Sequence, residues 1–332
     1  MLVRLVRYPY GNVLARAMAA RFESPAEVID QVGSQPLEEI RDELFPKELE
    51  GEVSVVQKWH RELHRMGQRI ADSLPAAPGE LILTYLKRSC FENLKLVCRF
   101  ILRGEKTPPP ASLFLPVPAD SWLPMAKLFQ ISSMEELASI LPRGQLRDLV
   151  RRGCDRSIPH GLFQMETAMD QHFWETVRVA AGRLSPFDRA AAEEILGARA
   201  DIDRLGLISR GFRSGCDEMT ILGGLPDMGT IFPRGKIRRA LRSKDPRAAL
   251  ISLYPIPAVG DPLGRAGETG LLHRLWKMLR EILRSHPFDV SIPLAVVLLK
   301  ELDILQSQVV RAGFLLGLER EELVLWAKET GE

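Results

Sequence analysis

The sequence has no apolar stretch long enough to cross a membrane. Its longest notable apolar run covers residues 294–299, whereas a spanning helix needs roughly 18 apolar residues or more. Arg4 and Arg7 stand near the start, where a signal peptide would have its apolar region. We therefore expect a cytoplasmic chain without a transmembrane segment of its own.

Cysteine is scarce and irregularly spaced. No C-x-x-C pair occurs, and four cysteines are too few to cross-link a chain of 332 residues. They are Cys90, Cys98, Cys154 and Cys216. We expect reduced thiols with a structural role, which argues against a disulfide-stapled fold.

An excess of charge of one sign is also lacking. Lys and Arg number 45 against 43 acidic residues, for a net charge of +2, so the molecule as a whole has no general attraction for nucleic acid. Hydrophobic residues make up 45% of the sequence and charged residues 27%, as in a soluble globular protein that buries a core.

Alternating patterns typical of strands are absent too, and apolar residues instead recur at spacings of three and four. This spacing predicts helices. They cover residues 13–22, 53–74, 82–102, 165–184, 189–212, 270–283 and 292–316. The expected fold class is therefore all-α, with at least about 60% helix.

One sequence motif, which we call the repeated phrase, occurs more than once. Residues 87–99, which run on to Gly104, share five identities with a segment 111 residues later. The identical positions of that segment are Arg199, Leu205, Leu207, Arg210 and Gly215. A third and weaker copy covers residues 300–311 and ends with Gly317. Repetition of one helical phrase indicates duplication.

Sequence signals for helix starts recur at nearly the same spacing as the repeated phrase. Residues 24–27, 133–136 and 245–248 each begin with a residue that can cap a helix. The period of roughly 100–110 residues is too long for a stacked solenoid. The sequence therefore predicts three similar helical bundles with approximate threefold pseudo-symmetry.

Proline- and glycine-rich breaks follow the first two copies of the phrase and mark the expected boundaries. The predicted units are residues 1–106, 107–215 and 216–332. A further break at residues 254–270 is expected to be a long loop inside the last unit.

Three motifs could carry chemistry, and each lacks a necessary part. His60 and His64 have the spacing of a zinc pair, but Arg61 stands where a zincin needs glutamate. Exposed histidines on a polar helix face are the better interpretation. Residues 229–236 have five residues between their glycines where a phosphate loop has four. Residues 260–267 carry glycines without a preceding strand.

An acid–base set is equally poorly supported. Glu166, Asp170 and His172 share one predicted helix, but no nucleophile or pocket accompanies them, and a surface helix is the better interpretation. We therefore predict no catalytic residue, no metal site and no cofactor.

One segment is densely basic. It contains Arg234, Lys236, Arg238, Arg239, Arg242 and Lys244 with no acidic residue among them. Such a patch could meet anionic lipid headgroups, an acidic protein face or nucleic acid. A solvated helix face is the alternative.

Four segments carry recognisable signatures. Residues 91–99 read acid-Asn-Leu-Lys-apolar-apolar-x-Arg, and residues 11–18 contain Asn-x-x-x-Arg-x-Met. Residues 165–174 are similar to Glu-x-x-Leu-Asp-x-x-Tyr-Phe, and residues 300–318 to Lys-Glu-Ile-Glu-Ile followed by Gly-x-x-x-Gly-Leu. In this order they resemble the C subunit of V-type and A-type ATPases or ATP synthases, called subunit d in eukaryotes.

The sequence departs from that family's pattern in several places. Met169, Phe173 and Trp174 are substitutions in the third segment, and Leu305 and Ser307 replace an expected Arg and Leu. The middle copy of the phrase has Arg204 and Gly206 in place of Asn and Lys. The chain looks like a divergent member.

The resemblance implies a non-catalytic rotor adaptor of a V/A-type rotary ATPase. Such a subunit is a funnel of three helical bundles, peripheral on the cytoplasmic face of the membrane. It links the central-stalk subunits to the membrane proteolipid ring and transmits torque for proton or sodium transport, without binding nucleic acid. A helical scaffold of another cytoplasmic complex and a helical enzyme remain the alternatives.

Each predicted unit has an arginine near the end of its last long helix, namely Arg99, Arg210 and Arg311. An arginine there commonly snorkels or binds helix-end carbonyls. The functional alternative is that the three gather into a socket for an acidic stalk tip. The resemblance further implies that the basic patch faces membrane headgroups or the polar loops of the ring.

Overall fold

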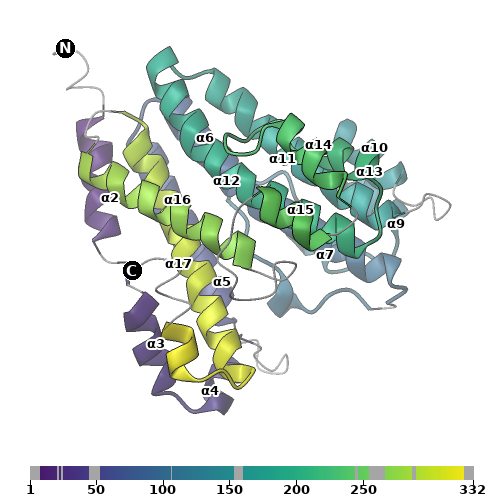
Figure 1. Ribbon diagram of the computed structural model, residues 1–332, viewed down its shortest axis with the longest axis horizontal. Helices are drawn as coiled ribbons and strands as arrows, with labels where there is room; N and C mark the ends of the chain where they lie inside the picture. Colours follow the sequence, from purple (N-terminus) through teal and green to yellow (C-terminus); the bar gives the residue numbers. More distant parts are fainter. Residues whose placement is uncertain are drawn as a thin grey trace. The chain divides into compact units, whose positions relative to one another are not determined.

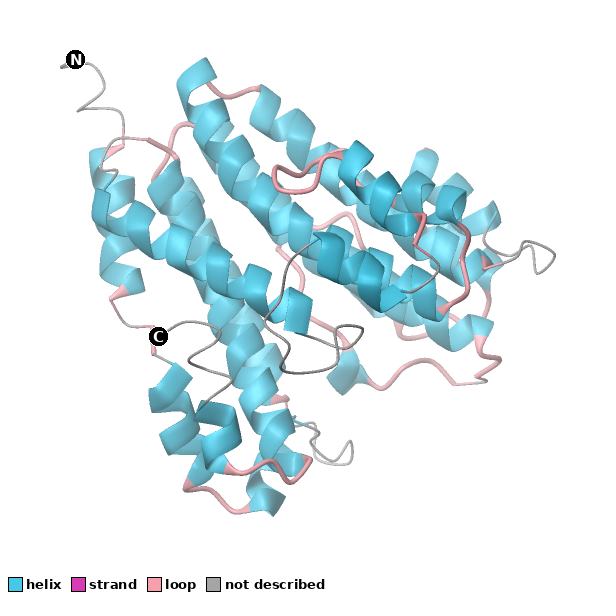
Figure 2. Ribbon diagram, viewed as in Figure 1, coloured by secondary structure: helices cyan, strands magenta, loops and turns pink. Residues whose placement is uncertain are grey.

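The computed structural model describes residues 8–20, 22–23, 25–44, 53–105, 107–152, 160–243, 246–253, 266–285 and 289–324. Helices account for 76% of these residues and no strand occurs among them, which confirms the all-α prediction (Figure 2). The chain forms two compact units. One comprises Met1–Leu86, Ala180–Ile195 and Thr269–Glu332, and the other comprises Lys87–Val179 and Leu196–Glu268.

The first unit is built around one long buried helix, α17 (Ser291–Leu315). Every residue from 291 to 302 is buried, so this helix is apolar nearly all round, as a helix in the middle of a core should be. It contacts α2 (Pro9–Ala19), α3 (Pro25–Gly33), α4 (Leu37–Leu44) and α5 (Val55–Asp72), which lie around it in Figure 1. The unit also holds α6 (Ala76–Leu86) and most of α16 (Ala266–Ser285).

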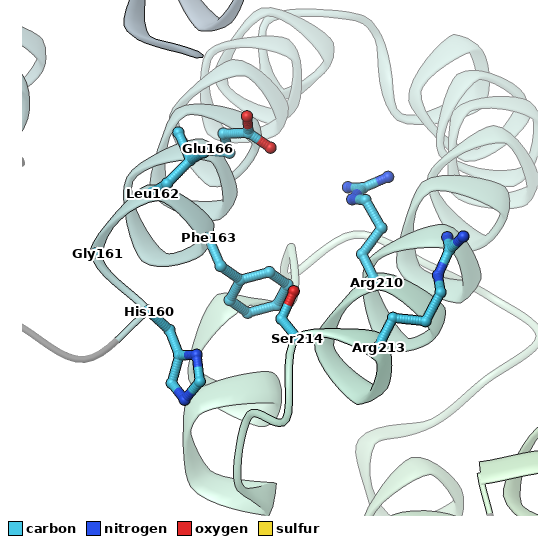
Figure 3. A pocket seen from close by; sticks show the side chains of 8 residues that line it. All are labelled: His160, Gly161, Leu162, Phe163, Glu166, Arg210, Arg213 and Ser214. Atoms are coloured by element: carbon cyan, nitrogen blue, oxygen red, sulfur yellow. The ribbon is translucent and has the colours of Figure 1, made fainter. Parts of the chain in front are cut away.

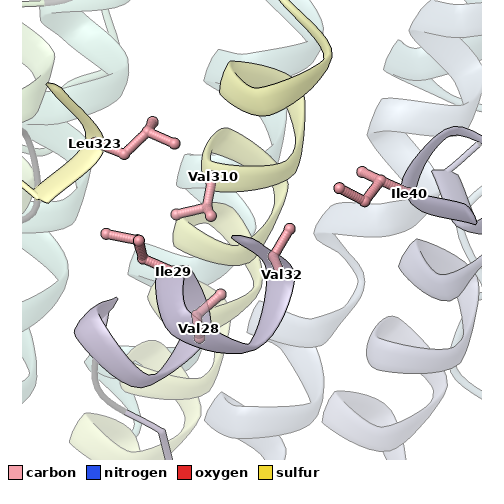
Figure 4. Packing of buried hydrophobic residues seen from close by; sticks show 6 residues of the cluster. All are labelled: Val28, Ile29, Val32, Ile40, Val310 and Leu323. Atoms are coloured by element: carbon pink, nitrogen blue, oxygen red, sulfur yellow. The ribbon is translucent and has the colours of Figure 1, made fainter. Parts of the chain in front are cut away.

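A small apolar cluster closes the C-terminal end of α17. Val28, Ile29 and Val32 of α3 gather with Val310 of α17 and with Leu323 (Figure 4). Ile40 of α4 completes the cluster. Burying these aliphatic side chains stabilises the packing of two short helices that could not persist alone.

The second unit contains the remaining helices, and two of them are long. α11 (Gly161–Gly182) and α12 (Pro186–Arg213) extend beyond it into the segment 180–195 of the first unit. The others are α7 (Arg88–Leu102), α8 (Met125–Leu128), α9 (Met134–Ile140), α10 (Gln145–Arg152), α13 (Glu218–Gly224), α14 (Arg234–Leu241) and α15 (Pro246–Leu253), with a short 3₁₀ turn η2 (Ala111–Leu113). Among the residues described, no helix combines the length and the apolarity that a membrane span requires.

All the predicted helices are present, and one of them is divided. The helix predicted over residues 82–102 is interrupted at Lys87, which separates α6 from α7. The predicted cap at Ser133 is confirmed, because its Oγ accepts a hydrogen bond from the Glu136 amide at 3.2 Å. The caps predicted at Ser24 and Asp245 fall outside the described residues.

The three copies of the repeated phrase end in the same way. Gly104, Gly215 and Gly317 close α7, α12 and α17 with φ angles of 77°, 68° and 79°. After each glycine, the next amide donates to the carbonyl five residues earlier, which forms the Schellman type of helix end. This shared cap agrees with duplication. The three sequence units and their threefold arrangement remain predictions.

A buried pair on α12 fixes the loop that precedes α14. Asp201 accepts hydrogen bonds from the amides of Thr230 at 2.7 Å and Ile231 at 2.6 Å. Its neighbour Arg204 donates to the carbonyl of Phe232 at 2.9 Å. Because both charged side chains lie inside the unit, the loop backbone supplies partners that water would otherwise provide.

Gly229 of this loop should not tolerate a side chain. Its φ angle is 151°, and a Cβ there would collide with Arg204 and Asp201. We expect Gly229→Ala to lower the free energy of unfolding by about 2–3 kcal/mol through overpacking and backbone strain. Gly235→Ala is the matched control, since a Cβ at Gly235 meets nothing within 4 Å. Thermal unfolding followed by circular dichroism measures both, and equal midpoints would refute the prediction.

Candidate functional site

Charged side chains of α7 and α11 pair across the second unit. The Lys95 ammonium contacts the Asp170 carboxylate, and Arg99 Nε donates to Glu166 Oε1 at 2.5 Å. The two bases and the two acids are each four residues apart, so successive turns of antiparallel helices meet. We call these four side chains the ion-pair ladder.

The ladder corrects the interpretation of α11 as a surface helix. Glu166 and Asp170 are buried rather than solvated. The acid–base set that the sequence analysis rejected is also not supported by the structure, in which the His172 ring packs 6.0 Å from that of Phe91. Burial lowers the pKa of His172, which favours the neutral imidazole.

Burial and ion pairing act against each other in and beside the ladder. Burial raises the pKa of Asp170 although Lys95 opposes that rise. Burial would lower the pKa of Lys95, but the carboxylates of Glu92 and Asp170 raise it above its usual value. Burial would raise the pKa of Glu92, but Lys95 and Arg88 bring it below its usual value. General acid–base catalysis favours a pKa near the working pH. This arrangement is better suited to bracing helices than to moving protons.

A second charged cluster, which we call the Asp203 node, lies about two turns away from Lys95 along α7. The Asp203 carboxylate of α12 accepts hydrogen bonds from both terminal nitrogens of Arg88, at 2.8 and 2.9 Å. It accepts another from Arg199 at 2.7 Å. The Trp174 indole adds a fourth hydrogen bond at 3.0 Å. Burial would raise the pKa of Asp203, but Arg199 and Arg88 hold it far below its usual range. Arg88 and Arg199 occupy the same position in two copies of the repeated phrase, and here they share one carboxylate.

Asn93 belongs to the signature at residues 91–99 and anchors the segment between η2 and α8. Asn93 is buried, and its side chain both accepts from the Leu115 amide at 2.8 Å and donates to the Leu115 carbonyl at 2.7 Å. This two-way bond imitates a step of β-pairing and satisfies the backbone of residue 115. The signature residues of α7 therefore hold neighbouring elements in place.

The last signature plays a similar part in the first unit. Lys300 of α17 pairs with Glu62 at 3.3 Å and Asp303 at 3.0 Å. Glu301 accepts a hydrogen bond from the Tyr85 hydroxyl. Charged residues of this buried helix are therefore matched by α5 and α6, which reduces the cost of burying them.

The three candidate socket arginines all have acidic neighbours. Arg99 and Arg210 lie beside the acids of α11, with Arg210 3.8 Å from Asp170, and their side chains are 40% and 44% exposed. Arg311 belongs to the first unit and is only 7% exposed. It donates to Glu43 at 3.1 Å, and its guanidinium lies 4.7 Å from the centre of the Trp59 ring. These contacts fit the structural role expected of such arginines.

The basic patch forms one face of α14. Ile237, Ala240 and Leu241 are buried, whereas four of its arginines point to solvent. The exposed arginines are Arg234, Arg238, Arg239 and Arg242. Lys236 is half-buried and donates to the Leu253 carbonyl at 2.7 Å. Arg234 pairs with Asp227, and Lys244 lies outside the described residues.

The possible zinc pair is not assembled as a metal site. His60 and His64 are half-buried on α5, so the interpretation as exposed histidines was wrong. Burial and the neighbouring His60 lower the pKa of His64 to about 4. The described part of the chain contains no group of three potential metal ligands. Residues 260–265 and Cys154 fall outside it, while Cys90, Cys98 and Cys216 are buried and form no disulfide among the described residues.

Comparison with known proteins identifies the family of this chain. The family model for the ATP synthase (C/AC39) subunit matches residues 12–323, a range that contains the ion-pair ladder, the Asp203 node and α17. The comparison with curated proteins gave no match. Because the family match spans nearly the whole chain, the protein belongs to the ATP synthase (C/AC39) subunit family.

Proposed function

We propose that the protein is the non-catalytic rotor adaptor of a V/A-type rotary ATPase. In this role it links the central stalk to the membrane proteolipid ring on the cytoplasmic face and transmits torque for proton or sodium transport. The observation that carries the proposal is the family match over residues 12–323.

The pattern of buried charge supports a mechanical role. A part that transmits torque must resist sliding between its helices. Ion pairs that join helices at fixed heights oppose sliding more specifically than apolar contacts do, because a shift of one turn leaves a buried charge without its partner. Lys95, Arg99 and Asp203 each form such links between helices.

We propose different roles for the three socket arginines. The partly exposed Arg99 and Arg210 remain candidates for seating an acidic stalk tip, since Arg210 is 3.8 Å from its nearest acid and can turn toward a partner. The burial of Arg311 against Glu43 and Trp59 favours a structural role there.

The exposed arginines of α14 should attract an anionic surface. Each basic residue close to an anionic leaflet contributes about 1 kcal/mol, so changing Arg238, Arg239 and Arg242 to Glu should weaken vesicle binding at least about 100-fold at low salt. Flotation with vesicles of phosphatidylcholine and phosphatidylserine measures this across a salt series.

A charge-matched control separates the patch from net charge. Arg143, Arg151 and Arg152 are exposed elsewhere in the second unit, and changing all three to Glu gives the same net charge. We expect this control to retain most of the binding. Equal affinity and an equal salt slope for wild type and the α14 variant would reduce the patch to a solvated helix face.

Affinity purification from membranes of the source organism tests the adaptor proposal. A tagged chain should copurify with central-stalk subunits and the proteolipid ring in fixed stoichiometry. Copurification with soluble proteins alone would favour the alternative, a helical scaffold of another cytoplasmic complex.

A further inference from the structure

An open-sided hollow lies where α11 begins and α12 ends, within the second unit. It encloses about 580 Å³. Figure 3 shows the Phe163 ring and the Ser214 hydroxyl near its middle, with His160 on one side and Arg210 and Arg213 on the other. Four polar side chains that line the hollow are exposed to solvent, namely His160, Arg210, Arg213 and Ser214.

The hollow has more positive charge than its own residues neutralise. Its one carboxylate, Glu166, is already engaged by Arg99 at 2.5 Å. Arg210 is 3.8 Å from Asp170, beyond hydrogen-bond distance. Arg213 has no hydrogen bond or ion pair with any residue that the structure describes. Two guanidinium groups, three residues apart on the last turn of α12, can therefore accept an external anion.

We propose that this hollow binds the carboxylate of an acidic polypeptide segment. Guanidinium groups match carboxylates in a planar, two-bond geometry. The lining carboxylate of Glu166 repels a multiply charged phosphate more strongly than a carboxylate, which bears a single negative charge. The half-buried Leu162 offers apolar surface for a neighbouring side chain of the bound segment. This inference rests on the proposed role of Arg210 in seating an acidic stalk tip, and the isolated chain is used to test it apart from the rotor role.

The test uses a fluorescein-labelled peptide of alternating Glu and Leu with an amidated end. Fluorescence anisotropy with the full-length protein at low salt should show saturable binding. Arg213→Glu should weaken binding at least about tenfold, because it removes a charge-assisted pair and adds repulsion. Arg213→Lys keeps the charge but loses the two-bond geometry of the guanidinium, and it should weaken peptide binding less than Arg213→Glu does. A Gln–Leu peptide should not bind.

The control variant is Arg143→Glu, between α9 and α10. Arg143 is also exposed but does not line the hollow, and the change in net charge is the same. Binding that is weakened by Arg143→Glu and unchanged by Arg213→Glu would overturn the proposal, as would no saturation with the wild type. Displacement of the peptide by inorganic phosphate at lower concentration than by acetate would assign the hollow to phosphate instead. Loss of copurification with the ring would bear on the rotor role alone.

Discussion

Replacing Asp203 with alanine should lower the free energy of unfolding by about 3–5 kcal/mol, because it leaves buried arginines without their carboxylate. Arg88, Arg199 and the Trp174 indole all bind this one side chain. Urea unfolding followed by tryptophan fluorescence measures the loss. Asp148→Ala is the control, since Asp148 is exposed on α10 and should change stability by no more than about 0.5 kcal/mol. A loss of stability in Asp203→Ala no larger than that in Asp148→Ala would contradict the stabilising role of Asp203.

The same node makes stability depend on pH in a defined direction. Burial alone would raise the pKa of Asp203, but Arg199 and Arg88 lower it strongly in the folded protein. A carboxylate with a lowered folded pKa stabilises the fold fully above its unfolded pKa of about 3.9, and less as the pH falls below that value. The advantage of wild type over Asp203→Asn should therefore be constant near neutral pH and shrink below about pH 4. An advantage that stays constant into acid would contradict the assignment.

Replacing Lys95 with methionine should lower the free energy of unfolding by a similar amount, about 3–5 kcal/mol. The substitution keeps the volume of the stem but leaves Glu92 and Asp170 without their shared ammonium. The double variant Lys95→Met with Asp170→Leu should recover part of the loss, since it also removes one of the two stranded carboxylates. Thermal unfolding of the two variants beside wild type measures both effects. A double variant less stable than the single one would mean that the pair does not act as a brace.

The long helices could be predicted from the sequence because their pattern is local. The apolar spacing of residues 189–212 and 292–316 is repeated over many turns, and α12 and α17 follow it closely. Short helices such as α4 and α13 were missed, since one or two turns give too few apolar positions to define a period. The interruption at Lys87 was missed for a similar reason, because the apolar spacing runs on across it.

The ion-pair ladder could not be predicted from periodicity, because periodicity does not say which helices pack together. Lys95 and Asp170 are 75 residues apart. One signal was present, namely the equal four-residue spacing of the two bases in α7 and the two acids in α11. The shared position of Arg88 and Arg199 in the repeat was another. Pairing them required the structure.

The hollow at the end of α12 was also missed, and for a different reason. An arginine at a helix C-terminus is common, because it complements the helix dipole. Arg213 therefore looks ordinary in the sequence. What distinguishes it is the absence of an acidic partner among the described residues, together with a side chain that lines an open hollow.

ATP-driven ion transport in membrane vesicles tests the central claim most directly. Vesicles from cells of the source organism that lack this chain can be compared with wild-type vesicles and with the same vesicles after adding back the purified protein. The adaptor role predicts that ATP is still hydrolysed by the head without the chain, while proton or sodium transport is lost and then restored on addition. Transport at the wild-type rate in its absence would contradict the account.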